Sequence, residues 1–331
     1  MYWIVFVYLF FLSFYAFGEQ LLNQDVDISS GSTLSNDSGL TIRELSGGPY
    51  TIDNRGTIEA TNITSNSNPN IRLEVGTSID NSGLIDTSGS ANLNSILFID
   101  NSGTNSLINS GTIQTETTGN YGQAIAVENA SLTEITNSSG GTIKVTDSSL
   151  NSGAIRINTG GSVNTITNNA TISAVGTTHS RGILSISTAT IDRITNTGTI
   201  SASGGSESNH GIVFWNDSGT TVTNSGTIQG TGGNYSYGIR LGSNGSISTI
   251  SNTGTIKGGK DGIANSGNIT NILNTGTITG TSGYSIHNGD GSITNLTNSQ
   301  NNLTFAGSVP TNYYVKVNSS SSYGKISFTS A

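Results

Sequence analysis

The apolar positions of this chain return at a nearly constant interval. The anchor is an isoleucine that usually follows Gly-Thr, with successive spacings of 27, 28, 30, 29, 28, 28, 28 and 22 residues. Leu303 lies 25 residues further on and is interpreted as a degenerate tenth member. Self-similarity at such a period is the signature of a repeat architecture. The anchoring residues are Ile58, Ile85, Ile113, Ile143, Ile172, Ile200, Ile228, Ile256 and Ile278.

Each repeat carries two further apolar slots. One lies two residues before an asparagine, at Ile52, Ile79, Leu107, Ile135, Ile166, Ile194, Val222, Ile250, Ile272 and Leu296. The other follows Gly-Thr-Ile, at Ile71, Ile96, Ile125, Ile155, Ile183, Ile212, Ile239 and Ile263. Apolar slots separated by turns rich in Gly, Ser and Asn predict three short strands per repeat.

These repeats predict an all-β chain, folded as a right-handed parallel β-helix (β-solenoid) with three short strands per coil and about ten coils. Stacked coils pair like strands in parallel at ~4.8 Å per coil, which gives a rod on the order of 50 Å long. The right-handed winding follows from the usual handedness of crossover connections between parallel strands.

The Gly-Thr-Ile slot alternates as a half-buried strand does. Its isoleucine is expected to point inward, and the residue before it, usually threonine, to point outward. The residue after the isoleucine varies freely, from Glu59 to Lys257, and is also expected to face outward. The next residue is small or medium-sized, as at Ala60 and Ala202, and is expected to point inward. This pattern predicts a thin apolar core inside each coil.

An asparagine four residues before the anchoring isoleucine is the second constant of the repeat. In the fourth unit the interval is six, and the extra residues Ser139 and Gly140 predict a local bulge. A buried amide without partners costs ~1–3 kcal/mol, so we expect these side chains to bond to one another in a ladder. Glycine in the following turn, as at Gly198 and Gly226, is expected to allow a positive φ. The expected structural ladder comprises Asn54, Asn81, Asn109, Asn137, Asn168, Asn196, Asn224, Asn252 and Asn274.

Composition divides the chain into four segments. Residues 1–18 are apolar, carry no charged side chain and end in Ala-Phe-Gly, which predicts a secretory signal peptide. The alternative is an uncleaved membrane anchor, although the run is short for a span of ~20 residues. Residues 19–45 lack the repeat and are expected to form an N-terminal cap, and residues 46–302 hold the β-helix repeats. Residues 303–331 are expected to form a C-terminal cap or transition segment.

Charge and cysteine content narrow the function further. The 12 Lys and Arg are scattered along a chain of net charge −8, so no basic patch is predicted and nucleic acid is not an expected partner. Because the chain has no cysteine, disulfides and thiolate metal sites are excluded. The histidines have no cysteine or carboxylate at ligand spacing, so neither a metal site nor any cofactor is expected. They are His179, His210 and His287.

The I-x-N-x-G-T-I repeats behind a signal-like segment resemble the passenger regions of autotransporters (type V secretion) and related adhesin-like surface proteins. The closing LTFAGSVPTNYYVKVNSSSSYGKISF resembles the segment that leads from such passengers toward a membrane barrel. The resemblance covers about residues 42–331 and implies an architecture and a secretion style, not an activity. Family members continue into a C-terminal barrel of alternating strands. That barrel is missing from this sequence, so a truncated passenger and a stand-alone exported protein both stay open.

Catalysis is the alternative, because several parallel β-helices are polysaccharide lyases or hydrolases and glycoside hydrolysis uses two carboxylates. Asp53 and Asp80 share one slot on adjacent coils, and Glu59 and Asp86 share another. The motifs of the polygalacturonase-like and pectate-lyase families are missing. These four acids are therefore interpreted as solvated outward positions, not as a catalytic or cation site.

Aromatic residues offer the one predicted binding surface. Trp215 follows the apolar run Ile212-Val213-Phe214, and two tyrosines lie one coil later. An exposed aromatic patch there would stack on sugar rings. The competing interpretation places Phe214 in the core and treats the other residues as decoration of strand ends. The expected patch consists of His210, Trp215, Tyr235 and Tyr237.

The sequence therefore predicts a non-catalytic exported surface β-solenoid, an adhesin or passenger-type binding or spacer protein. The alternative is a carbohydrate-active parallel β-helix enzyme, a polysaccharide lyase or hydrolase with a divergent site. Expected partners are glycans or cell-surface molecules, and membrane contact is expected only through a missing barrel or an uncleaved signal segment. The protein is expected to be a monomer at the bacterial cell surface, associated with the outer membrane or extracellular.

Overall fold

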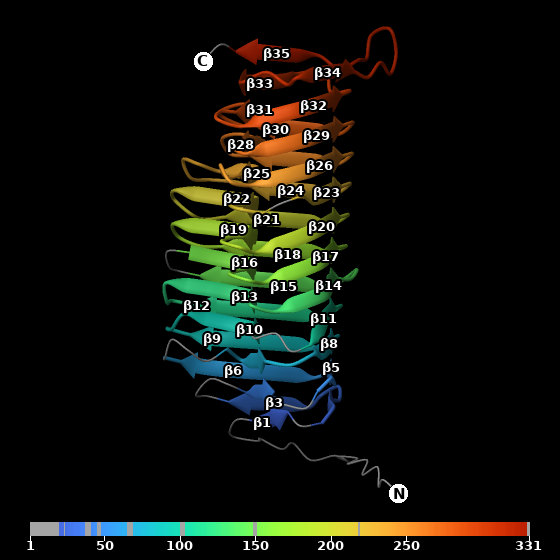
Figure 1. Cartoon of the computed structure of the whole chain (residues 1–331). Coiled ribbons are helices and arrows are strands. Elements are labelled where there is room, and N and C mark those ends of the chain that lie inside the picture. Colours follow the sequence, from blue (N-terminus) through green and yellow to red (C-terminus); the bar gives the residue numbers. More distant parts are fainter. Residues whose placement is uncertain are drawn as a thin grey trace, which may run out of the picture.

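Three parallel β-sheets wind the chain into a solenoid (Figure 1). The computed structural model describes residues 20–22, 24–36, 41–44, 48–64, 69–99, 103–147, 151–217 and 219–329, and these contain no helix. Each coil up to β30 contributes one strand to each sheet, the later strands belong to two of the sheets only, and the coils stack in about nine turns. The predicted parallel β-helix with three strands per coil is confirmed. The predicted signal peptide, residues 1–18, lies outside the described residues.

Sheet 1 holds the slot that ends in asparagine. Its strands are β2 (Val26–Ile28), β5 (Tyr50–Asn54), β8 (Thr77–Asn81), β11 (Thr104–Asn109), β14 (Ser131–Asn137), β17 (Ser162–Asn168), β20 (Thr190–Asn196), β23 (Thr220–Asn224), β26 (Ser246–Asn252), β29 (Asn268–Asn274), β32 (Ser292–Asn298) and β34 (Asn312–Val315). Equivalent asparagines pair in register from β5 to β32, which keeps one side-chain position aligned along the rod.

Sheet 2 holds the Gly-Thr-Ile slot. Its strands are β3 (Thr33–Asn36), β6 (Thr57–Ile63), β9 (Leu84–Gly89), β12 (Thr112–Thr117), β15 (Thr142–Asp147), β18 (Thr171–Val175), β21 (Thr199–Ser203), β24 (Thr227–Gly230), β27 (Thr255–Gly258) and β30 (Thr277–Gly280). The anchoring isoleucines are fully buried, and the residues on either side of them are half-buried or exposed. The predicted alternation of this slot is confirmed.

Sheet 3 holds the third slot. Its strands are β1 (Gln20–Leu22), β4 (Ile42–Glu44), β7 (Ile71–Leu73), β10 (Leu93–Ile99), β13 (Tyr121–Glu128), β16 (Asn151–Ile157), β19 (His179–Ser185), β22 (Ser208–Phe214), β25 (Tyr237–Leu241), β28 (Ile263–Asn265), β31 (Ile286–Asn288), β33 (Leu303–Gly307) and β35 (Ile326–Thr329). Residues one position after the slot's isoleucine, such as Arg156 and Arg240, and two positions before it, such as Arg181 and Tyr237, line pockets on the outer face.

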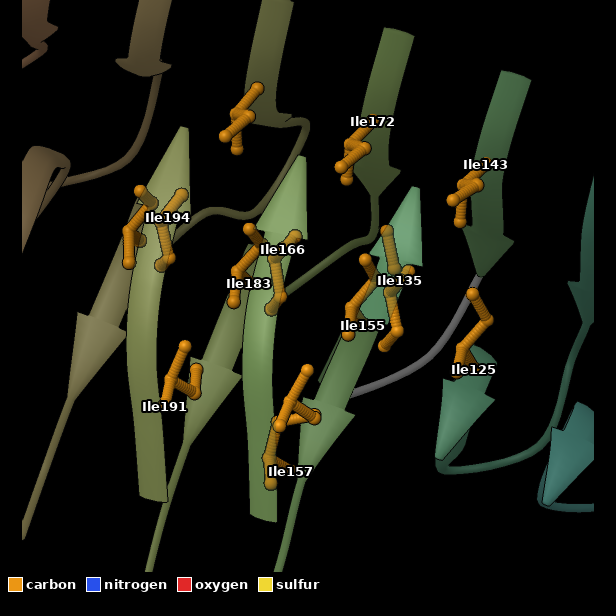
Figure 2. Close-up of a cluster of buried hydrophobic side chains, with 14 of the residues drawn as sticks. Ile125, Ile135, Ile143, Ile155, Ile157, Ile166, Ile172, Ile183, Ile191 and Ile194 are labelled. Carbon is orange, nitrogen blue, oxygen red and sulfur yellow. The ribbon is translucent and has the colours of Figure 1, made fainter. Parts of the chain in front are cut away.

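The core is a stack of branched aliphatic side chains inside the three sheets. Figure 2 shows isoleucines of all three sheets facing a common interior, with Ile143 and Ile172 from sheet 2 opposite residues of sheets 1 and 3. These side chains are fully buried. β-Branched residues suit a pleated surface that is buried on one face. Most of the core continues along the rod as one cluster, and a small second cluster is formed by Ala60, Ile63, Ala91 and Leu93.

The last position of the repeat strands of sheet 1 carries a continuous asparagine ladder. Each side-chain Nδ2 donates to the Oδ1 of the asparagine one coil further on, at 2.6–3.0 Å from Asn54 to Asn298. The nine asparagines predicted for the ladder all lie in it, and every one is fully buried. The column starts at Asn54 because the coil below places Ile28 in its register.

The glycine after each ladder asparagine is required by close packing and not by backbone conformation. Gly198 and Gly226 are not among the residues with positive φ, so the expectation of a left-handed turn there is wrong. A Cβ on Gly226 would collide with the carbonyl oxygen of Gly198 in the coil below. Ala170 occupies this position once, above the turn lengthened by Ser139 and Gly140. There the hydrogen bond from Thr171 N to Gly141 O stretches to 3.3 Å, against 2.8 Å from Thr227 N to Gly198 O.

Both ends of the rod continue the sheets. Strands β1 to β4 fall within the predicted N-terminal cap; β1 pairs with β4, and β2, β3 and β4 already pair with the first repeat coils. Leu303 lies in β33 of sheet 3 and pairs with β31 and β35, so its interpretation as a tenth Gly-Thr-Ile member is wrong. Among the described residues there is no helix of the length and apolarity needed to cross a membrane.

Candidate functional site

The outer face of sheet 3 aligns chemically active side chains from successive coils. Arg181 of β19, His210 of β22 and Tyr237 of β25 stand in register in one column. Each lies two residues before the buried isoleucine of its slot, and the glycine between them is skipped in the strand pairing. This irregularity breaks the strict alternation of the strand, so these side chains need not share the inward face of the isoleucine. Arg240 of β25 follows the same isoleucine and lies on the same face. The fold therefore gathers residues that are about one repeat apart in the sequence.

His210 and Tyr237 form a buried aromatic pair. Their ring centroids lie 5.1 Å apart and the ring planes differ by 8°. His210 is only 1% exposed and Tyr237 8%, so the expectation of an exposed patch is wrong for these two residues. Burial, together with the charges of Arg240 and Arg181, lowers the pKa of His210 well below its ordinary value. His210 is consequently neutral at physiological pH.

Trp215 is held between a cation and a glycine. The guanidinium carbon of Arg240 lies 4.3 Å from the centroid of the indole ring and 5.8 Å from that of Tyr237. A Cβ on Gly242 would come within 2.8 Å of Cε3 of Trp215, so only glycine leaves room for the indole. Cation–π contact with Arg240 fixes the orientation of both aromatic rings. Sequence reasoning missed Arg240.

An open pocket of about 370 Å³ lies beside this cluster. Its walls include Arg240, Tyr237 and Tyr235, and Tyr235 is 53% exposed. The Lys260 ammonium lies 4.9 Å from the ring centroid of Tyr235. Trp215 is half-buried and Phe214 is fully buried, as the competing interpretation placed Phe214. Of the four predicted patch residues, Tyr235 and Trp215 thus remain accessible.

The lining of the same pocket also pairs a histidine with an acid from the next coil. His179 Nδ1 lies 2.7 Å from Ser208 Oγ, and its Nε2 lies 3.4 Å from a carboxylate oxygen of Glu207. His287 similarly lies 3.4 Å from Asp261. The expectation that no carboxylate accompanies the histidines is therefore wrong. Among the described residues, no group of three or more potential His, Cys or acidic ligands is close enough to hold a metal ion.

Three arginines gather on the same face, which corrects the expectation that no basic patch exists. Arg156 lies on β16, Arg181 on β19 and Arg240 on β25. Burial and the charges of Arg240 and Arg156 lower the pKa of Arg181 to about 10, so the group stays charged at neutral pH. The signal was present in the sequence, because Arg156 and Arg240 follow the same slot isoleucine three coils apart.

The four acids considered for catalysis lie on early coils of the rod, on strands β5, β6, β8 and β9, and not on the coils of the pocket. Asp53 pairs in register with Asp80 in sheet 1, and Glu59 pairs with Asp86 in sheet 2, as their shared slots predicted. Asp53 lies 3.6 Å from Arg55 in an exposed ion pair. Neighbouring strands place the members of each pair side by side, but the two pairs belong to different sheets.

Neither a protein-family model, a curated protein nor a solved structure matches this chain.

Proposed function

We propose that this chain is an exported, non-catalytic surface β-solenoid that binds carbohydrate through the outer face of sheet 3. The observation that carries the proposal is the open pocket where Tyr235, Tyr237 and Arg240 meet, with Trp215 fixed beneath the Arg240 guanidinium. Aromatic faces bind the apolar faces of sugar rings, and arginine and tyrosine donors bind their hydroxyl groups.

The rigid backbone around the pocket supports the proposed binding function. The pocket residues are borne on strands and short turns of a solenoid whose backbone is paired above and below. Sites on such elements are held more precisely than sites on free loops, which lowers the ordering cost of binding. Export and a surface location rest on the apolar segment 1–18 and the autotransporter-like repeats.

Binding is tested on a glycan array followed by titration calorimetry with the best ligands. Tyr235→Ala is expected to weaken binding by about tenfold, a typical loss for removing one stacking aromatic residue. Tyr314→Ala is the matched control, because Tyr314 is 52% exposed, against 53% for Tyr235, but lies on β34. Equal losses in both variants, or no glycan binding by the intact protein, would overturn the proposal.

The enzymatic alternative is tested on the same ligands. Bound oligosaccharides are incubated with the protein, and new reducing ends are measured. The proposal expects none above background. Release of reducing ends that is lost in Asp53→Asn or Asp80→Asn would replace the binding function by that of a carbohydrate-active enzyme.

A further inference from the structure

A second pocket, of about 190 Å³, opens on the same face of sheet 3. Its lining comes from four successive coils and includes Tyr121, Arg156, Arg181 and Trp215. Trp215 joins the second pocket to the first. The indole lines the second pocket, and the guanidinium of Arg240, which lines the first pocket, lies over the indole ring. The two pockets therefore form one surface that runs along the rod from β13 to β25, about 19 Å at the usual coil spacing.

The guanidinium groups of this surface have few partners. Arg181 Nη1 donates to Asn151 Oδ1 at 3.2 Å, and Arg240 Nη1 lies 3.5 Å from His210 Nε2. The Nε atoms of Arg156 and Arg181 are buried and have no hydrogen-bond partner among the described residues. Each guanidinium has five N–H donors. The two Nη contacts given above occupy only a few of the outer Nη–H donors of these three arginines, so the remaining ones are left for a ligand.

These charges also have no counter-ion in contact. Within the described part of the chain, no carboxylate lies within salt-bridge distance of Arg156, Arg181 or Arg240. Glu128 acts on Arg156 only through longer-range attraction. The rest of the chain is acidic, with a net charge of −8. A cation cluster on an acidic protein attracts anions locally and repels other cations.

We infer that Arg156 and Arg181 form an anion subsite, and that the ligand of this surface is an acidic polysaccharide lying along the rod axis. This inference rests on the proposed carbohydrate-binding function. Guanidinium groups bind carboxylate and sulfate oxygens with two parallel hydrogen bonds. Trp215 lies between the subsite and the first pocket, where it can stack on the adjoining sugar ring. Uronate and sulfate groups share the required chemistry.

The test compares four probes on the intact protein by titration calorimetry. They are a polygalacturonate oligomer, a sulfated dextran oligomer, a neutral gluco-oligosaccharide of the same length and a single-stranded oligonucleotide. At least one acidic sugar is expected to bind about tenfold or more tighter than the neutral one, with an affinity that falls as salt is added. The uronate and sulfate arms identify which anion the subsite prefers.

Variants assign the effect to the subsite. Arg156→Gln and Arg181→Gln are each expected to weaken acidic-sugar binding about tenfold and to leave neutral-sugar binding unchanged. Arg193→Gln removes the same charge from an exposed position of β20 in sheet 1 and is expected to change neither. Thermal unfolding of each variant checks that the solenoid is intact. Arg181→Lys keeps the charge without the two-pronged donor, and an intermediate affinity is expected.

The outcomes separate this inference from the function on which it rests. Equal binding of acidic and neutral sugars overturns the anion subsite and leaves carbohydrate binding standing. Failure of every oligosaccharide overturns both. Tighter binding of the oligonucleotide than of any sugar would overturn the assignment of a polysaccharide, and equal losses in Arg193→Gln would reduce the effect to net charge.

Discussion

The side-chain Nδ2 of Asn196 lies 2.7 Å from the Oδ1 of Asn224, and neither side chain is exposed. The same nitrogen also approaches the backbone carbonyls of Gly198 and Thr227 at 3.1 Å. Each amide therefore joins its own turn to the coil above. Because the coil below supplies an equivalent bond, from Asn168 at 2.7 Å, each ladder residue between the two ends of the column couples three coils.

Asn196→Leu is expected to destabilise the solenoid. The change removes one of the three acceptors of Asn168 Nδ2, which keeps the carbonyls of Ala170 and Thr199, and it leaves the Oδ1 of Asn224 without its donor. Buried polar groups left unpaired in this way cost ~1–3 kcal/mol each. Ser201→Leu, at a tolerant outer position of sheet 2, is expected to cost less than about 1 kcal/mol. Urea unfolding of both variants measures the difference, and equal midpoints would show that the ladder adds no stability.

Gly226→Ala is expected to destabilise the chain although alanine occurs at the equivalent Ala170. The added methyl group would meet the carbonyl of Gly198, whereas Ala170 lies above a longer turn. Forcing an extra carbon into close packing costs ~1–3 kcal/mol. The reciprocal change, Ala170→Gly, is expected to cost no more than about 1 kcal/mol. Thermal unfolding of the two variants decides the matter, and a harmless Gly226→Ala would contradict the close approach between coils.

The fold could be predicted because one interval governs core, turns and register together. Isoleucine spacing fixes the coil length, and strand alternation then fixes which side chains are buried. The role of Gly226 was predicted wrongly, since a sequence shows that a glycine is needed but not whether conformation or crowding requires it. Leu303 was misplaced because a leucine and a tyrosine-rich tail fit more than one slot.

The candidate site was only partly predictable. Trp215 and Tyr235 stand out as rare aromatic residues, but their neighbours decide what they can bind. Arg240 lies 25 residues from Trp215 in the sequence and above it in space, because one coil separates them. The burial of His210 depends on Tyr237 covering it from the next coil. Such contacts follow from the register between coils. A sequence prediction finds them only when it aligns the outward-facing positions of successive coils as well as the core positions.

Acid is expected to destabilise the protein through His210. Its folded pKa is lowered, so the unfolded chain binds the proton more readily. The stability from keeping this group neutral is fully present above the unfolded pKa of about 6.5 and is lost as pH falls below it. One such group contributes at most about 1.36 kcal/mol per pH unit. Urea unfolding between about pH 7.5 and 5 measures this slope.

Two variants isolate that contribution. His210→Phe keeps a ring against Tyr237, and His210→Gln removes it, but neither takes up a proton. Both are expected to show a shallower loss of stability over the pH range, whatever their stability at neutral pH. An unchanged slope in both variants would mean that other groups cause the acid sensitivity.

Arg181→Met is expected to raise thermal stability, because burying the Arg181 charge costs folding free energy. The guanidinium is largely buried beside two others, and its lowered pKa of about 10 reflects the cost of holding that charge. An apolar side chain of similar length keeps the packing and removes the repulsion. Since salt screens charges, the gain over the intact protein should shrink when salt is added. Arg193→Met, at an exposed position, is expected to change stability little at any salt concentration. If Arg181→Met instead lowers the melting temperature at both low and high salt, the guanidinium is a structural element of sheet 3 and not a donor set aside for a ligand.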